Sequence, residues 1–147
     1  MFQRLTIKNF KSLKDITLDF AQFTTLIGEN SCGKSTVLQG IDLLSSLAQR
    51  DIDEYLKDKG WTFEDIKSQF SSDKSDPISF IADIFTKSYH LEWTISINYD
   101  AELWNVEENL FDLNNGYQCV FNDLFFKDFA GASLKPNLKS SYMKLFS

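Results

Sequence analysis

The sequence predicts an α/β fold in which antiparallel strands come first, one long helix follows, and an antiparallel β meander comes after the helix. Residues 2–8 and 14–20 alternate apolar and polar side chains, as strands with one exposed face do. Residues 34–49 change to helical spacing, and residues 78–121 return to strand-like alternation. These three observations determine the fold class.

The N-terminal elements can be assigned one by one. Between the first two predicted strands, residues 9–12 (Asn-Phe-Lys-Ser) predict a turn. Residues 23–27 form a short apolar run with β-branched residues that stops at Gly28, and this pattern predicts a buried strand. The helix over 34–49 places Val37 and Leu44 on its apolar face.

The middle of the chain is charged and irregular. Short helices are expected over 53–59 and 62–70, and Thr62 with Asp65 resembles a capping box. A loop is expected over 71–77 because Ser, Asp and Pro are concentrated there.

Three further strands are expected, followed by a tight turn. Asn114-Asn115-Gly116 predicts a hairpin because Asn and Gly tolerate positive φ. The strands cover 78–85, 90–99 and 104–113, with a returning strand over 117–121 and a helix over 138–146. The chain is therefore expected to be one partial domain with four sections, 1–50, 51–77, 78–121 and 122–147, the last of which starts a helical region.

Composition and charge narrow the function classes. The 147-residue chain is 43% hydrophobic and 15% aromatic, as a folded domain is, and its net charge is −6. Fifteen of its 21 acidic residues lie in residues 51–112, which disfavours contact between that stretch and DNA phosphates. Two cysteines make no disulfide framework, and the sequence shows neither an apolar span nor a leader. A cytoplasmic protein without a membrane partner is expected.

One motif carries chemistry. The stretch Gly28-Glu29-Asn30-Ser31-Cys32-Gly33-Lys34-Ser35 matches the phosphate-binding P-loop (Walker A) pattern G-x-x-x-x-G-K-[ST], between a predicted strand and a predicted helix. The glycines let backbone N–H groups approach phosphate, the Lys34 ammonium reaches the β- and γ-phosphates, and the Ser35 hydroxyl ligates Mg²⁺. Thr36 is expected near the α-phosphate. ATP and Mg²⁺ are the predicted cofactors.

Hydrolysis would also need an acid at the end of a buried strand. Asp83, Asp100 and Asn122-Asp123 are the candidates, and each fits poorly. The strands before Asp83 and Asp100 alternate with polar residues, and the third stretch directly follows a hairpin turn. His90, the one histidine, is expected to be structural. The sequence therefore names no catalytic residue, and hydrolysis by this chain alone is left uncertain.

The opening of the chain resembles the N-terminal lobe of ABC-type ATPases of the RecF, SMC and OLD class, and most closely OLD-like AAA ATPases. The resemblance is carried by residues 5–12 (Leu-Thr-Ile-Lys-Asn-Phe-Lys-Ser), 16–18 (Ile-Thr-Leu), 26–30 (Leu-Ile-Gly-Glu-Asn) and 33–36 (Gly-Lys-Ser-Thr). It implies an ABC-ATPase-like P-loop NTPase fold. Lys11 stands where many relatives have Arg, which implies a contact with the nucleotide.

The resemblance also implies partners. In the class, two ATPase heads sandwich ATP, as a homodimer or through a complementary lobe, and act on DNA or on a nuclease effector in DNA repair or anti-phage (antiviral) defence. The Walker B and signature motifs of the class do not appear in this sequence. Two alternatives remain open: a non-enzymatic module that uses nucleotide as a structural ligand, and a small stand-alone NTPase or kinase that uses Asp83 or Asp100.

Overall fold

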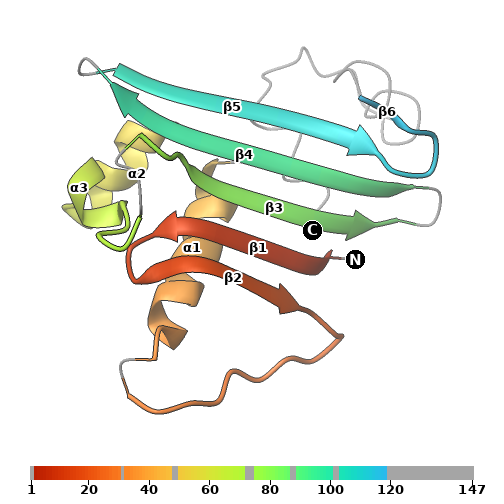
Figure 1. Cartoon of the computed structure of the whole chain (residues 1–147), viewed down its shortest axis with the longest axis horizontal. Coiled ribbons are helices and arrows are strands. Elements are labelled where there is room, and N and C mark those ends of the chain that lie inside the picture. Colours follow the sequence, from red (N-terminus) through yellow and green to blue (C-terminus); the bar gives the residue numbers. More distant parts are fainter. Residues whose placement is uncertain are drawn as a thin grey trace.

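The computed structural model describes residues 2–30, 32–47, 50–71, 75–86, 89–100 and 103–118. Within these ranges six strands form one antiparallel sheet in the order β2-β1-β3-β4-β5-β6 (Figure 1). The strands are β1 (Phe2–Phe10), β2 (Leu13–Asp19), β3 (Ile78–Phe85), β4 (His90–Asp100), β5 (Leu103–Asp112) and β6 (Tyr117–Gln118). The helices are α1 (Lys34–Leu47), α2 (Ile52–Lys59) and α3 (Phe63–Ile66).

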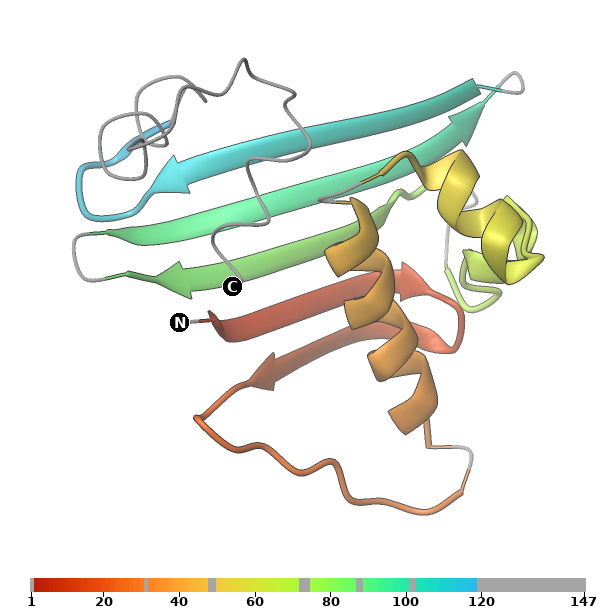
Figure 2. The same ribbon diagram turned by 180° about the vertical axis from the view of Figure 1, so that it is seen from behind.

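Alternation gives the sheet one apolar face, and α1 lies on it. Every second residue of β3, from Ile78 to Ile84, is buried, and β4 follows the same pattern. Figure 2 shows α1 crossing this face over β1. The close approach occurs at Gly40, where an added Cβ would lie 3.0 Å from Ile7 Cδ1. The core therefore lies between α1 and the middle of the sheet.

The sheet joins two parts of the chain that are distant in sequence. Strand β1 pairs on one side with β2 and on the other with β3, with Leu5 opposite Leu18 and Ala82. The N-terminal hairpin and the later meander are thus one sheet, and the helices between them lie on its apolar face (Figures 1 and 2). This pairing places the β1–β2 turn beside the start of α1.

The predicted strand over residues 23–27 is wrong. In the structure this stretch is an exposed loop that leaves the end of β2 and returns to α1 (Figure 1). Phe23 is 86% and Ile27 89% exposed. A strand requires a neighbour for its backbone groups, and no described strand runs beside this segment. Instead, the loop makes a local hydrogen bond, in which the Ala21 N–H donates to the Thr24 hydroxyl at 3.0 Å.

The helix expected over 62–70 is shorter than predicted. Its capping box is confirmed, since the Asp65 carboxylate accepts from both the Thr62 N–H and the Thr62 hydroxyl. The helix ends at Ile66 because Lys67 takes an extended conformation and forms a bridge with Phe10. The Ser68 N–H then donates to the Asn9 carbonyl at 2.9 Å. Pairing with the end of β1 thus replaces further helix.

The other described elements confirm the sequence-based assignments to within two residues at each boundary. Turn residues follow β5 at 113–116, as the Asn-Asn-Gly signal predicts, and Gly116 has a φ of 70°. The remainder of the returning strand from residue 119, the helix over 138–146 and helix residues 48–49 lie outside the described residues. Within the described ranges, no helix combines the length and apolar character needed to cross a membrane.

The β5–β6 turn depends on Asp112, a buried carboxylate. It accepts hydrogen bonds from the Asn115 side chain and from the N–H groups of Asn114 and Asn115. The Asn115 side chain, then these backbone donors and His90, hold the pKa of Asp112 below its ordinary value, although burial opposes them.

We expect Asp112→Ala to lower the free energy of unfolding by about 1–2 kcal/mol at neutral pH, since several hydrogen bonds to a carboxylate are lost. A depressed folded-state pKa contributes stability that is present above the unfolded value, about 3.9, and is lost as the pH falls through the folded-state pKa. In urea unfolding at pH 7 and at successively lower pH, the free energy of unfolding of the wild type should therefore approach that of Asp112→Asn as the pH falls. A constant difference across that range would contradict this assignment.

Candidate functional site

The P-loop lies at the start of α1, as the motif predicts. Residues 28–35 connect the exposed loop to the helix, which begins at Lys34, and the Val37 N–H donates to the Gly33 carbonyl at 2.9 Å in its first turn. Glu29, Asn30 and Cys32 are exposed, whereas Ser31 lies outside the described residues. The free N–H groups of the first helical turn and the helix dipole favour an anion here.

The Lys34 ammonium lies inside the loop. It donates to the carbonyl oxygens of Gly28 and Glu29, each at 2.6 Å, and lies 3.5 Å from Cys32 Sγ. The lysine is therefore folded back over the residues that begin the loop. Phosphate oxygens accept more strongly from an ammonium than neutral carbonyls do, so this position fits a phosphate ligand.

The loop geometry favours glycine at both motif positions, and most strongly at Gly33. Gly33 has a φ of 92°, which side-chain-bearing residues rarely adopt, and an added Cβ would lie 3.2 Å from Leu13. A Cβ on Gly28 would lie 2.6 Å from Cys32 Sγ. A side chain at either position would thus strain the loop or push aside its neighbours, and the residues present fit a phosphate cradle.

The β1–β2 turn contacts the first turn of α1. The Ser12 hydroxyl lies 3.1 Å from the Thr36 hydroxyl, and the exposed Ser35 immediately precedes Thr36. The antiparallel pairing of β1 with β2 places this turn at the P-loop end of the helix (Figure 2). The structure therefore brings the turn that carries Lys11 beside the first turn of α1, next to Thr36.

Lys11 is held apart from the loop. Its ammonium donates to Gln39 Oε1 at 3.0 Å and lies 3.3 Å from the centroid of the Trp61 ring. Burial lowers the pKa of Lys11, and the nearby Asp65 carboxylate opposes that shift. The resemblance predicted a nucleotide contact for Lys11, and its contribution to nucleotide binding stays a prediction.

Sequence reasoning missed both partners of Lys11. Gln39 follows Ser35 by four residues, so helical spacing alone could have placed it on the same side of α1 as the Ser35 hydroxyl. Trp61 carried no such signal, because it follows α2 in a segment whose position depends on tertiary packing.

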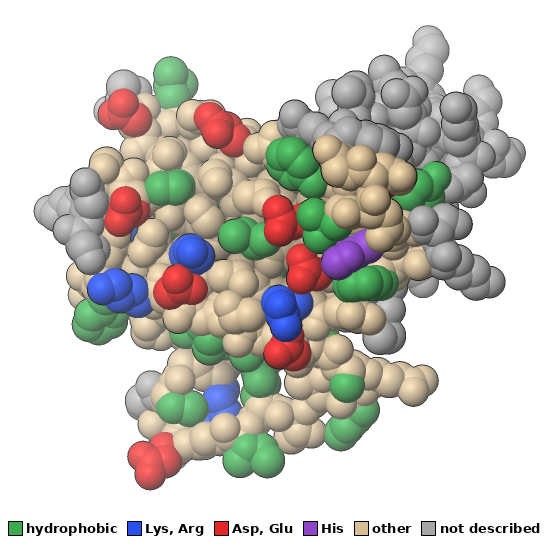
Figure 3. All heavy atoms as spheres, turned by 45° about the vertical axis from the view of Figure 1, so that its right-hand side comes forward, with side chains coloured by type: hydrophobic (Ala, Val, Ile, Leu, Met, Phe, Trp, Pro, Cys, Tyr) green, Lys and Arg blue, Asp and Glu red, His purple; other side chains and the backbone are tan. Residues whose placement is uncertain are grey.

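The acidic candidates lie away from the loop. Asp83 alternates with the buried residues of β3 and therefore points to the face opposite α1, where acidic and basic side chains are interspersed (Figure 3). Asp100 is exposed at the end of β4, beside the β4–β5 hairpin, and residues 122–123 lie outside the described ranges. His90 stacks on Phe85 with ring centroids 3.7 Å apart, which agrees with a structural role.

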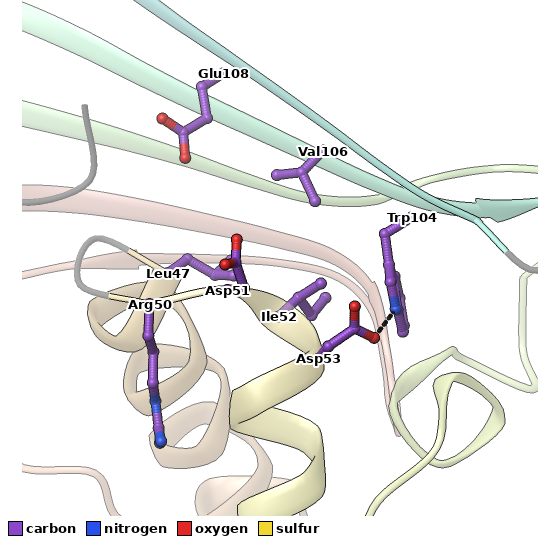
Figure 4. Close-up of a pocket in the computed structure, with 8 residues that line it drawn as sticks. All are labelled: Leu47, Arg50, Asp51, Ile52, Asp53, Trp104, Val106 and Glu108. Atoms are coloured by element: carbon purple, nitrogen blue, oxygen red, sulfur yellow. Dashed lines mark hydrogen bonds between the residues drawn. The ribbon is translucent and has the colours of Figure 1, made fainter. Parts of the chain in front are cut away.

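A separate cavity of about 410 Å³ lies at the opposite end of α1 (Figure 4). It is bounded by the α1–α2 connection on one side and by the start of β5 on the other, and Trp104 Nε1 donates to Asp53 across it. Its lining residues are Leu47, Arg50, Asp51, Ile52, Asp53, Trp104, Val106 and Glu108. Since α1 spans fourteen residues, about 21 Å of helix separates this cavity from the P-loop.

Comparison with known proteins identifies the family of the chain. The sequence model of one family, described as an AAA ATPase domain, matches residues 1–145. The chain is also 46% identical over 44 residues to an OLD nuclease of Thermus scotoductus (strain ATCC 700910 / SA-01), and this match covers 30% of the chain and 8% of that nuclease. The chain therefore belongs to the AAA ATPase domain family, and the predicted OLD-like N-terminal region is confirmed.

Proposed function

We propose that this chain binds ATP with Mg²⁺ through residues 28–36 and forms the ATP-binding part of a RecF/OLD-like ATPase. The observation that carries the proposal is the Lys34 ammonium, which lies inside a loop at the N-terminus of α1 and hydrogen-bonds to two loop carbonyls. Membership of the AAA ATPase domain family supports the same ligand.

Each site residue has a separate role in the proposal. Lys34 contacts the β- and γ-phosphates, the Ser35 hydroxyl holds Mg²⁺, and Thr36 lies near the α-phosphate. The N–H groups of the loop, from Gly28 to Gly33, bind phosphate oxygens. Mg²⁺ would bridge the β- and γ-phosphates and neutralise their charge.

Hydrolysis is proposed to need a further component. Asp83 points away from α1, and Asp100 lies at the far hairpin, so neither acid is placed beside the P-loop among the described residues. We infer that residues 1–147 form part of one ATPase domain, completed by a second head or lobe. The local similarity to an OLD nuclease supports a nuclease effector. DNA as a target, a role in repair or anti-phage defence and a cytoplasmic location are part of the proposal and rest on the resemblance of the opening residues to the RecF, SMC and OLD class.

Calorimetric titration of the chain with ATP and Mg²⁺, together with a steady-state assay of phosphate release, tests the proposal. We expect one ATP to bind per chain without turnover. No heat of binding would refute the ATP-binding function. Turnover that disappears in Asp83→Asn or Asp100→Asn would instead favour a stand-alone NTPase.

The Ser35→Ala variant should separate the metal contribution from the phosphate contribution. We expect its affinity for ATP to fall about tenfold in the presence of Mg²⁺ and to change little in EDTA, because the hydroxyl acts through the metal. Ser45→Ala on the exposed surface of α1 is the matched control. Equal losses with and without Mg²⁺ would contradict the metal-ligand role.

A further inference from the structure

Lys11 has a backbone conformation that glycine would adopt with less strain. Its φ is 49°, in the left-handed region that residues other than Gly, Asn and Asp rarely adopt. The side chain at this position is nevertheless engaged, between Gln39 and the Trp61 ring. Strained positions of this kind often belong to functional sites.

The same turn is attached to two different parts of the molecule. Toward the P-loop, the Ser12 hydroxyl contacts Thr36. Toward the helices, the Lys11 N–H donates to the Ile66 carbonyl at 2.8 Å, at the end of α3. Trp61 itself packs edge-on against Tyr55 of α2, with ring centroids 6.2 Å apart. Lys11 therefore lies between the P-loop helix and the segment that contains α2 and α3.

The distance along α1 is short. Gln39, which holds the ammonium, follows Ser35 by four residues, a rise of about 6 Å along the helix. The flexible four-carbon side chain of lysine can rotate over such a distance. A phosphate oxygen attracts an ammonium more strongly than a neutral amide or an aromatic face does.

We propose that Trp61 is a positioning residue that holds the Lys11 ammonium away from the nucleotide phosphates, and that nucleotide binding draws Lys11 off the Trp61 ring. This inference rests on the proposed ATP-binding function. It adds a competition: Trp61 and Gln39 bind Lys11 in one state, and phosphate binds it in the other. The α2–α3 segment thereby senses whether the P-loop holds a nucleotide.

The proposed competition predicts that removal of Trp61 changes the affinity for ATP in the direction opposite to the one that a purely structural role would produce. Trp61→Leu should tighten ATP binding about two- to fivefold in calorimetry, because Lys11 no longer leaves a cation–π contact on binding. In a Lys11→Met background the same substitution should change affinity by less than a factor of about 1.5. A merely structural Trp61 would weaken binding when removed.

Intrinsic fluorescence gives an independent measurement. Addition of ATP and Mg²⁺ to the whole chain should shift tryptophan emission, and the shift should be lost in both Trp61→Phe and Lys11→Met. Trp104→Phe and Lys8→Met are the matched controls and should keep it, because Trp104 bonds to Asp53 and Lys8 pairs with Asp15 on the outer face.

The results separate this inference from the function on which it rests. If the wild-type chain binds ATP but Trp61→Leu weakens that binding or leaves it unchanged, the competition is refuted while the ATP-binding function stands. The same holds if the emission shift persists in Lys11→Met. If the wild-type chain binds no ATP, both the function and the inference are refuted.

Discussion

Replacing Lys34 with alanine is expected to reduce the affinity for ATP by about a hundredfold or more and to leave the fold intact. The ammonium lies inside the loop, with its hydrogen bonds directed to two carbonyls and its third donor toward Cys32 Sγ. On nucleotide binding these donors would turn to phosphate oxygens, and hydrogen bonds between charged groups contribute about 1.5–3 kcal/mol each. Two such bonds correspond to two or more decades in the dissociation constant.

The fold should survive because the Lys34 contacts are confined to an exposed loop. Calorimetry measures the affinity, and thermal unfolding without nucleotide measures the stability, which should change by less than about 0.5 kcal/mol. Lys14→Ala, an exposed lysine on neighbouring β2, is the matched control and should retain wild-type affinity. Unchanged ATP affinity in Lys34→Ala would contradict the proposal that the loop binds phosphate.

The loop-to-helix junction at the P-loop motif was predictable because its signal is local. The spacing of Gly28, Gly33 and Lys34 is set by backbone geometry within eight residues, and a change of period after Lys34 marks the helix. The meander was predictable for a similar reason. Period-two alternation identifies β3 and β4, and Asn-Asn-Gly identifies the turn after β5.

The errors arose where structure depends on distant partners. Residues 23–27 have the composition of a buried strand, but composition cannot supply the neighbouring strand that a buried strand needs. The end of α3 at Ile66 depends on pairing between Lys67 and Phe10, residues 57 positions apart in the sequence. The contact between Lys11 and Trp61 likewise requires the β1–β2 turn to pack beside the α2–α3 connection.

Phe10 is the second residue whose substitution is expected to have a large effect, here on stability. Its packing also positions the β1–β2 turn. Phe10 is fully buried at the end of β1, with its ring centroid 5.9 Å from that of Phe80. A Cβ added at Gly40 of α1 would lie 3.5 Å from the same ring. The ring thus fills the space between helix and sheet, next to the turn that carries Lys11.

Phe10→Ala is therefore expected to lower the free energy of unfolding by about 3–5 kcal/mol, since the variant loses apolar burial and leaves a cavity. That loss is a large fraction of the roughly 5–15 kcal/mol that stabilises a typical domain. Urea unfolding monitored by circular dichroism measures it. Phe23→Ala is the matched control, because its ring is 86% exposed and its loss should cost less than about 0.5 kcal/mol. Similar costs in the two variants would mean that α1 does not pack on β1 through Phe10, and the placement of Lys11 beside α1 would then lose its structural basis.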